Sequence, residues 1–222
     1  LSRALQKQEG FRETLTDAVI EEMCSAAPLH DVGKIAISDT ILLKPARLTP
    51  EEFSVMQTHT TRGGAMIERI FRNLEDPSFL RLAEEIAVSH HEKWDGTGYF
   101  LGLKGEEIPL GGRILAVCDV FDAITSKRHY RSKMEITDAL KIITEGKNRH
   151  FDPEVVNKFM DISTFDILSV MQKEKISSIN PEEQNILKRF KLMELCAILN
   201  KERKNSKENS LVNTFNKYYL AT

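Results

Sequence analysis

The chain has 222 residues, 41% hydrophobic and 29% charged, which is enough apolar surface for one sizeable core. This composition excludes collagen-like, mucin-like and membrane-spanning chains. Lysine and arginine number 31 against 33 acidic residues, a net charge of −2, so we expect no DNA partner. The three cysteines are far apart, and we expect them to be reduced and mostly buried. Because the sequence shows no membrane span and no leader, we expect a cytoplasmic protein.

Helical start and stop signals dominate the chain. Thr49-Pro50-Glu51-Glu52 combines an N-cap, a proline and a capping-box glutamate, and predicts a helix that runs to about Arg72. Strand signals are scarce, so we expect an all-α fold. Further helices are predicted to start at Asp76-Pro77 and Asp152-Pro153 and to cover residues 114–124 and 135–145.

Two stretches without helical periodicity, residues 34–48 and 93–112, are predicted to be long ordered loops, which are usually functional. One more helix is predicted from Asn180, with apolar residues as far as Ala197 on one side. The charged run 201–208 predicts a frayed or disordered tail. We therefore expect a catalytic domain over residues 1–165 and a C-terminal helical extension with a polar tail over 166–222.

Histidines and aspartates recur at regular intervals along the first half of the chain. His30 and His59 are 29 residues apart, His59 and His90 are 31 apart, and His91 and Asp119 are 28 apart. Each separation corresponds to one helix out, a turn and one helix back, which would bring the side chains to one end of a bundle. Imidazole and carboxylate together suit Fe, Mn or Zn, and six ligands favour two ions. The set is His30, Asp31, His59, His90, His91 and Asp119. The alternative, a histidine with a purely structural role, is assigned to His129 and His150.

Longer motifs surround these residues. In chain order they are APLHDVGK (27–34), ILLKP (41–45), HHEKWDGTGY (90–99), RILAVCDVFDA (113–123) and SKRHYR (126–131). Together they resemble the HD-GYP family, a bacterial branch of the HD-domain phosphohydrolases, over about residues 20–160. The resemblance implies an HD-domain helical bundle with long active-site loops. It also implies an enzyme that hydrolyses cyclic di-guanosine monophosphate (cyclic di-GMP) at two or three metal ions, typically Fe or Mn.

Two departures qualify the resemblance. Phe100 and His129 stand where the family has proline. No histidine precedes His30, where the family places another ligand, so we expect two divalent ions. The chain also begins with Leu1, and we expect a sensory or receiver domain upstream of it.

The resemblance implies a role for each site residue. The six histidines and aspartates would be metal ligands, with Asp31 bridging the ions. Lys34 would contact a phosphate oxygen or protonate the leaving O3′ oxygen, and with Asp31 it forms the catalytic pair. The substrate would be held by Lys34, Arg128, Arg131, Asp95 and Tyr99. The alternatives are solvated surface charges for the lysine and the arginines, and a core position for Tyr99 and Trp94.

Two other functions stay open. One is an HD-type phosphohydrolase of a different nucleotide, which would use the same metals. The other is a catalytically weak signalling domain that binds a partner, for example of the GGDEF type. Hydrolysis of cyclic di-GMP could stop at linear pGpG or continue to GMP.

Overall fold

The computed structural model describes residues 1–72, 77–126, 134–172, 176–177 and 179–220. These residues form helices and no strand, which confirms the predicted all-α fold class. Extended pairing within them is limited to two isolated bridges, Lys147 with Phe151 and Ser163 with Lys191. None of the described helices is both long and apolar enough to cross a bilayer.

The chain divides into two compact units. The first comprises Ser2–Ala123 and Gly146–Val155, and the second comprises Leu1, Ile124–Glu145 and Val156–Thr222. All six predicted metal ligands belong to the first unit. The domain boundary expected near residue 165 stays a prediction.

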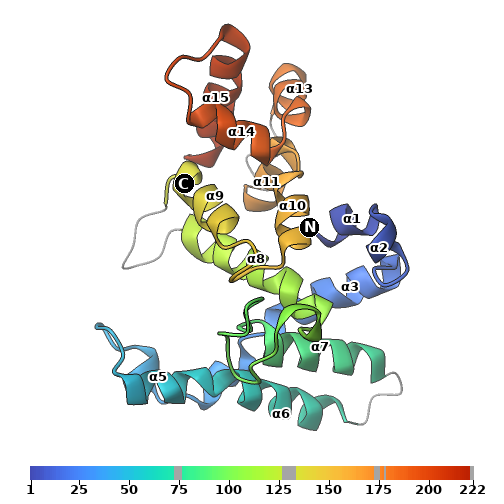
Figure 1. Cartoon of the computed structure of the whole chain (residues 1–222), viewed down its shortest axis with the longest axis vertical. Coiled ribbons are helices and arrows are strands. Elements are labelled where there is room, and N and C mark those ends of the chain that lie inside the picture. Colours follow the sequence, from blue (N-terminus) through green and yellow to red (C-terminus); the bar gives the residue numbers. More distant parts are fainter. Residues whose placement is uncertain (73–76, 127–133, 173–175, 178, 221–222) are drawn as a thin grey trace. The chain divides into compact units, whose positions relative to one another are not determined.

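The first unit is built from short helices joined by ordered loops (Figure 1). Its elements are α1 (Ser2–Gln6), α2 (Glu9–Arg12), α3 (Asp17–Ala26), η1 (Ala27–Leu29), η2 (Val32–Ala36), α4 (Asp39–Leu42), α5 (Pro50–Gln57), α6 (His59–Phe71), α7 (Pro77–Ser89) and η3 (Gly105–Glu107). Helix α8 (Leu110–Thr125) and helix α10 (Pro153–Met160) begin in this unit.

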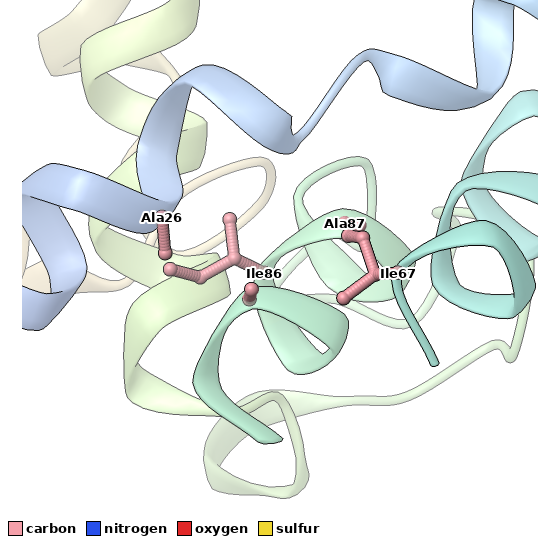
Figure 2. Packing of buried hydrophobic residues seen from close by; sticks show 5 residues of the cluster. Ala26, Ile67, Ile86 and Ala87 are labelled. Carbon is pink, nitrogen blue, oxygen red and sulfur yellow. The ribbon is translucent and has the colours of Figure 1, made fainter. Parts of the chain in front are cut away.

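Small and branched apolar residues hold α3, α6 and α7 together. Figure 2 shows Ala26 of α3 and Ile67 of α6 facing Ile86 and Ala87 of α7, and each of these side chains is at most 1% exposed. Because the alanines are small, the helices approach closely. Two predicted metal ligands lie at the ends of these helices: His59 opens α6, and His90 directly follows α7.

The single helix predicted from Thr49 to Arg72 is wrong. Helix α5 ends at Gln57 and α6 begins at His59, with a break at Thr58. The Thr58 hydroxyl donates to the carbonyl of Val55 at 2.7 Å, and His59 Nδ1 donates to the carbonyl of Met56 at 2.8 Å. Such bonds from a side chain to the preceding backbone compete with helix continuation, and here they coincide with the break at Thr58.

The two predicted loops are ordered and mostly irregular, but each contains short helical turns. The first carries part of η2 and the single turn α4, and it is tied to α5 by Lys44, whose ammonium lies 2.5 Å and 2.8 Å from the carboxylate oxygens of Glu52. The second contains η3 and ends where α8 begins at Leu110. The predicted start at Asp152 is confirmed, because its carboxylate accepts from the N–H of Glu154 at 2.8 Å. Asp76 lies outside the described residues.

The second unit consists of α9 (Ile136–Glu145), α11 (Thr164–Met171), α13 (Pro181–Arg189), α14 (Leu192–Leu199) and α15 (Ser206–Tyr219). The one helix predicted from Asn180 is two helices. The N–H of Thr164 donates to Phe190 O at 2.8 Å, and the N–H of Leu192 donates to Ile162 O at 2.9 Å. This pairing holds the backbone between α13 and α14 extended. Helix α14 buries Leu192, Leu195 and Ile198, whereas Ala197 is exposed.

The predicted disordered tail is wrong, because α15 is a packed helix. Asn205 caps it, and Glu208 completes a capping box, so the end of the charged run lies in its first turn. Leu211, Phe215 and Tyr219, one helical turn apart, are completely buried. The Tyr219 hydroxyl donates to the carbonyl of Met134 at 2.6 Å.

The cysteines depart in part from the expectation. Cys24 is exposed, whereas Cys118 and Cys196 are half-buried, and all three are free thiols. Helix α3 buries Ile20, Met23 and Ala26, and Cys24 follows Met23 by one residue, which rotates it about 100° away from the core.

Candidate metal centre

Four of the six predicted ligands meet in one partly buried cluster. One ligand atom from each of Asp31, His59, His90 and His91 lies within 4.8 Å of the others. Asp31 precedes η2, His59 opens α6, and the two adjacent histidines follow α7. Since α6 and α7 pack side by side in opposite directions, the start of one meets the end of the other (Figure 1).

A glycine allows the segment that carries Asp31 to reach this pair. A Cβ atom on Gly33 would lie 1.9 Å from the carbonyl oxygen of His59 and 2.5 Å from the backbone nitrogen of Gly63. Only a residue without a side chain permits η2 to cross α6 at this distance. The crossing brings the carboxylate of Asp31 to His59, with Oδ1 and Nε2 3.5 Å apart.

Three histidines are oriented by their own backbone. Nδ1 of His30 donates to the carbonyl of Ala27 at 2.7 Å, and Nδ1 of His59 donates to that of Met56 at 2.8 Å. Nδ1 of His90 donates to the carbonyl of Ala87 at 2.9 Å. With the proton on Nδ1, Nε2 of His59 and of His90 presents a lone pair to the cluster. A carbonyl acceptor behind a ligand imidazole is the usual arrangement in metal sites.

Asp31 lies between the histidines. Its Oδ1 atom is 3.5 Å from His59 Nε2 and 3.9 Å from His90 Nε2, and it is buried without a hydrogen-bond partner. Its Oδ2 atom is 3.3 Å from His30 Nε2 and 2.5 Å from the ammonium of Lys34. A buried carboxylate oxygen without a donor is costly unless a cation compensates for it, so the residues present fit a divalent metal ion.

The protonation states also suit a metal. Burial lowers the pKa of His90 to about 4, with help from His30 and His59, and burial lowers the pKa of His59 as well. Burial and the adjacent His90 lower the pKa of His91 to about 2. For Asp31, burial acts to raise the pKa, but hydrogen bonds from His30 and Lys34 outweigh it and hold the pKa below its usual range. Neutral imidazoles around an ionised carboxylate are a metal-binding set.

The remaining two predicted ligands lie beside the cluster. His30 Nε2 is 3.8 Å from Asp119 Oδ1, which α8 presents from the other side. Hydrogen bonds to Asp31 and to the Ala27 carbonyl outweigh burial and raise the pKa of His30. All six predicted ligands are therefore close together in the first unit.

The predicted substrate residues other than Lys34, which contacts Asp31, fall into three groups. Tyr99 lies at the centre, its ring 4.9 Å from that of His91, and burial together with Asp31 raises the pKa of its hydroxyl. The carboxylate of Asp95 instead accepts from the N–H of Thr97 at 2.9 Å and from its hydroxyl at 2.6 Å, which stabilises the loop itself. Arg128 and Arg131 lie outside the described residues.

Two residues next to the centre were not predicted from the sequence. Phe53 of α5 meets the ring of Tyr99 edge to face at 6.1 Å. Glu92, directly after the two histidines, is only 2% exposed. A half-exposed phenylalanine on a helix carries no sequence signal for such a contact. Glu92, by contrast, lies in the motif HHEKWDGTGY, which the sequence shows and which could have pointed to it.

Comparison with known proteins agrees with this geometry. A family model described as "HD domain" matches residues 2–155. A "Cyclic di-GMP phosphodiesterase" of Vibrio cholerae is 51% identical over 152 residues, which is 68% of this chain and 31% of that protein. A protein of the same description from Thermotoga maritima is 44% identical over 161 residues, which is 72% of this chain and 42% of that protein.

A third relative has a different stated specificity. The "3'3'-cGAMP-specific phosphodiesterase 2" of Vibrio cholerae is 41% identical over 147 residues, which is 66% of this chain and 27% of that protein. The chain thus spans less than half the length of the curated relatives that it matches.

Proposed function

The chain belongs to the HD domain family, and we propose that it is a metal-dependent phosphodiesterase that hydrolyses cyclic di-GMP. The observation that carries the proposal is the convergence of Asp31, His59, His90 and His91, with His30 and Asp119 beside them. These residue types at these distances suit hydrolysis by a metal-activated water, which is the chemistry of a cyclic dinucleotide phosphodiesterase.

We propose that the site holds two divalent ions, Fe or Mn, joined by Asp31. Ligand atoms on one ion at about 2.1 Å lie at most about 4.2 Å apart. Asp31 Oδ1, His59 Nε2 and His90 Nε2 satisfy that limit, with separations of 3.4–3.9 Å. His30 Nε2 satisfies it with Asp31 Oδ2 at 3.3 Å and with Asp119 Oδ1 at 3.8 Å. These two sets share the carboxylate of Asp31, which supports its assignment as the bridging ligand.

When bound, the ions would activate a water molecule and neutralise charge on the phosphate. The protein's part is to hold His59, His90 and His91 neutral and Asp31 ionised in a fixed array. Lys34, whose side chain is 37% exposed, places its ammonium at the edge of the array against Asp31. From there it can donate to a phosphate oxygen and give its proton to the departing O3′ oxygen.

Substrate contacts are assigned by the same proposal. Tyr99 offers a ring beside the centre for a guanine base, and Arg128 and Arg131 supply the phosphate contacts. Asp95 acts on the substrate only through the loop that it stabilises. A second candidate substrate is 3',3'-cGAMP, because a relative at 41% identity is described as specific for it.

The test is hydrolysis by the full chain purified without oxygen. Metal content is measured by elemental analysis, and products from cyclic di-GMP and 3',3'-cGAMP are separated by chromatography. We expect Fe or Mn, faster hydrolysis of cyclic di-GMP, and loss of both metal and turnover in His90→Ala. His150→Ala is the matched control, since His150 stacks on Phe151 at 4.2 Å and is not part of the cluster. A wild-type protein with metal but without hydrolysis of either dinucleotide would overturn the proposal.

Three further assignments belong to this proposal. Residues 1–165 form the catalytic domain, which is supported by the family match to residue 155. A cytoplasmic location is supported by the three free cysteines. A sensory or receiver domain upstream and a GGDEF-type partner complete the assignment.

A further inference from the structure

Glu92 is a buried carboxylate that the hydrolysis does not use. Its side chain follows the two ligand histidines, and the residue is 2% exposed. The carboxylate accepts three backbone hydrogen bonds from the far end of the same loop. Oε1 accepts from the N–H of Leu101 at 2.6 Å and of Gly102 at 3.2 Å, and Oε2 accepts from the N–H of Leu103 at 3.1 Å. Residues 98–103 are therefore folded around one side chain, and we call them the Glu92 loop.

The loop closes on the backbone as well. A Cβ atom on Gly98 would lie 2.4 Å from the backbone nitrogen of Lys93 and 2.5 Å from the Cα atom of Glu92. The N–H of Tyr99 donates to the carbonyl of His91 at 3.2 Å. The loop thus contacts the chain at its start, through Gly98 and Tyr99, and at its end, through the three amides that Glu92 binds.

This closure determines where the Tyr99 ring lies. Tyr99 is the second residue of the loop and part of its first attachment, and its ring is tilted 31° over that of His91 at 4.9 Å. The carboxylates of Asp31 and Asp119 are close enough to contribute to the raised pKa of the Tyr99 hydroxyl. Release of the far end of the loop would leave the Tyr99 amide bond, the packing of Gly98 and the ring contacts with His91 and Phe53 to hold the ring at the centre.

We propose that Glu92 is a positioning residue that clamps its loop and so fixes Tyr99 over His91 for substrate binding. The proposal deepens the cyclic dinucleotide phosphodiesterase function and rests on it for its kinetic part. Glu92 touches neither the proposed ions nor the substrate; it acts through the loop backbone.

A carboxylate is required because all three partners are donors. Bonds from backbone N–H groups to an ionised acceptor are about twice as strong as neutral ones. In Glu92→Gln, one of the two acceptors becomes an NH₂ donor that opposes a backbone N–H. In Glu92→Asp the charge stays, but the side chain is one methylene shorter, about 1.5 Å, and cannot reach all three amides. Both variants should open the loop by different means.

The first readout is amide hydrogen exchange of the metal-loaded protein, which needs no activity. We expect the amides of Leu101, Gly102 and Leu103 to exchange at least tenfold faster in Glu92→Gln and Glu92→Asp than in the wild type. Glu106→Gln, the same change at an exposed position of the same long loop, is the matched control and should leave those amides protected. Trp94, the sole tryptophan, reports loop opening by a shift in its fluorescence.

The second readout is kinetic and separates positioning from simple destabilisation. Loss of a residue that orients a site group costs about 10–100-fold in activity. We expect that loss in kcat/KM for Glu92→Gln with metal content unchanged. If Glu92 acts through Tyr99, the double variant Glu92→Gln with Tyr99→Ala should be no slower than Tyr99→Ala alone.

The outcomes are distinct. Unchanged exchange at residues 101–103 in both Glu92 variants would overturn the clamp. Faster exchange with additive losses in the double variant would overturn the action through Tyr99. If the wild type hydrolyses no cyclic dinucleotide, the proposed function fails, whereas the exchange result still decides whether Glu92 holds the loop.

Discussion

Gly33→Ala is the substitution whose effect follows most directly from the structure. The added methyl group would lie 1.9 Å from the carbonyl oxygen of His59, 2.5 Å from Gly63 N and 2.9 Å from Gly63 Cα. All three are backbone atoms of α6 and cannot rotate away. A carbon–oxygen contact requires about 3.3 Å, so η2 and α6 must move apart by roughly 1.4 Å.

The consequence for the metal centre can be estimated from the same shift. Asp31 immediately precedes η2 and His59 begins α6, and their ligand atoms are 3.5 Å apart. A separation larger by roughly 1.4 Å brings them to about 5 Å, beyond the ~4.2 Å that two ligands on one ion can span. We therefore expect Gly33→Ala to lose metal as well as stability.

Overpacking of a tight contact costs about 1–3 kcal/mol in free energy of unfolding. For a chain of this size, about 2 kcal/mol lowers Tm by roughly 4–8 °C. Thermal unfolding with elemental analysis of the purified variant measures both effects. Gly10→Ala is the matched control, because a Cβ atom at Gly10 of α2 meets nothing within 4 Å. A Gly33→Ala protein with wild-type Tm and metal content would refute the close crossing of η2 and α6.

Three further predictions test other parts of the molecule. Burial lowers the pKa of His150 to about 4, so below pH 6.5 the protein takes up a proton when it unfolds. The free energy of unfolding should therefore fall as the pH drops from 6.5 to 4. His150→Gln should flatten that decline, measured by urea unfolding at several pH values. Arg113→Met leaves the buried carboxylate of Asp152 without its ion-pair partner, now 2.8 Å away, and should cost about 3–5 kcal/mol in urea unfolding. Leu211→Ala in α15 should cost about 2–5 kcal/mol, measured in the same way, because Leu211 is completely buried.

Each of these has a clear contrary result. A His150→Gln protein with the wild-type pH profile would show that His150 titrates normally. Lys201→Met removes the half-exposed partner of Glu208 and should lower the free energy of unfolding by less than about 1 kcal/mol. If Arg113→Met lowers it no more than that, the buried ion pair of Arg113 with Asp152 is contradicted. A Leu211→Ala variant as stable as the wild type would indicate that α15 is not packed.

The regular spacing of the histidines predicted their convergence, but only partly for the right reason. The path from His59 to His90 is one helix out along α6 and one back along α7, as the spacing indicated. The path from His30 to His59 instead runs through η2, α4 and α5, and that from His91 to Asp119 runs through a long loop and half of α8. The ligands meet because these irregular segments cross the helices closely, as η2 crosses α6 at Gly33.

Local signals predicted the helix starts better than the helix ends. Caps at Thr49, Asp152 and Asn180 were readable because their partners lie within three residues. The break at Thr58 depends on bonds from side chains to the preceding backbone, which a helix-compatible pattern does not exclude. The burial of α15 depends on neighbours far along the chain, so the charged run by itself predicts a tail.

Anomalous diffraction from crystals of the anaerobically purified protein, at the Fe and Mn absorption edges, tests the central claim most directly. The account predicts anomalous density within bonding distance of Asp31, His59 and His90 and next to His91, with a second peak between Asp31, His30 and Asp119. Metal-loaded crystals that show no peak at these side chains, or only peaks elsewhere on the surface, would contradict it.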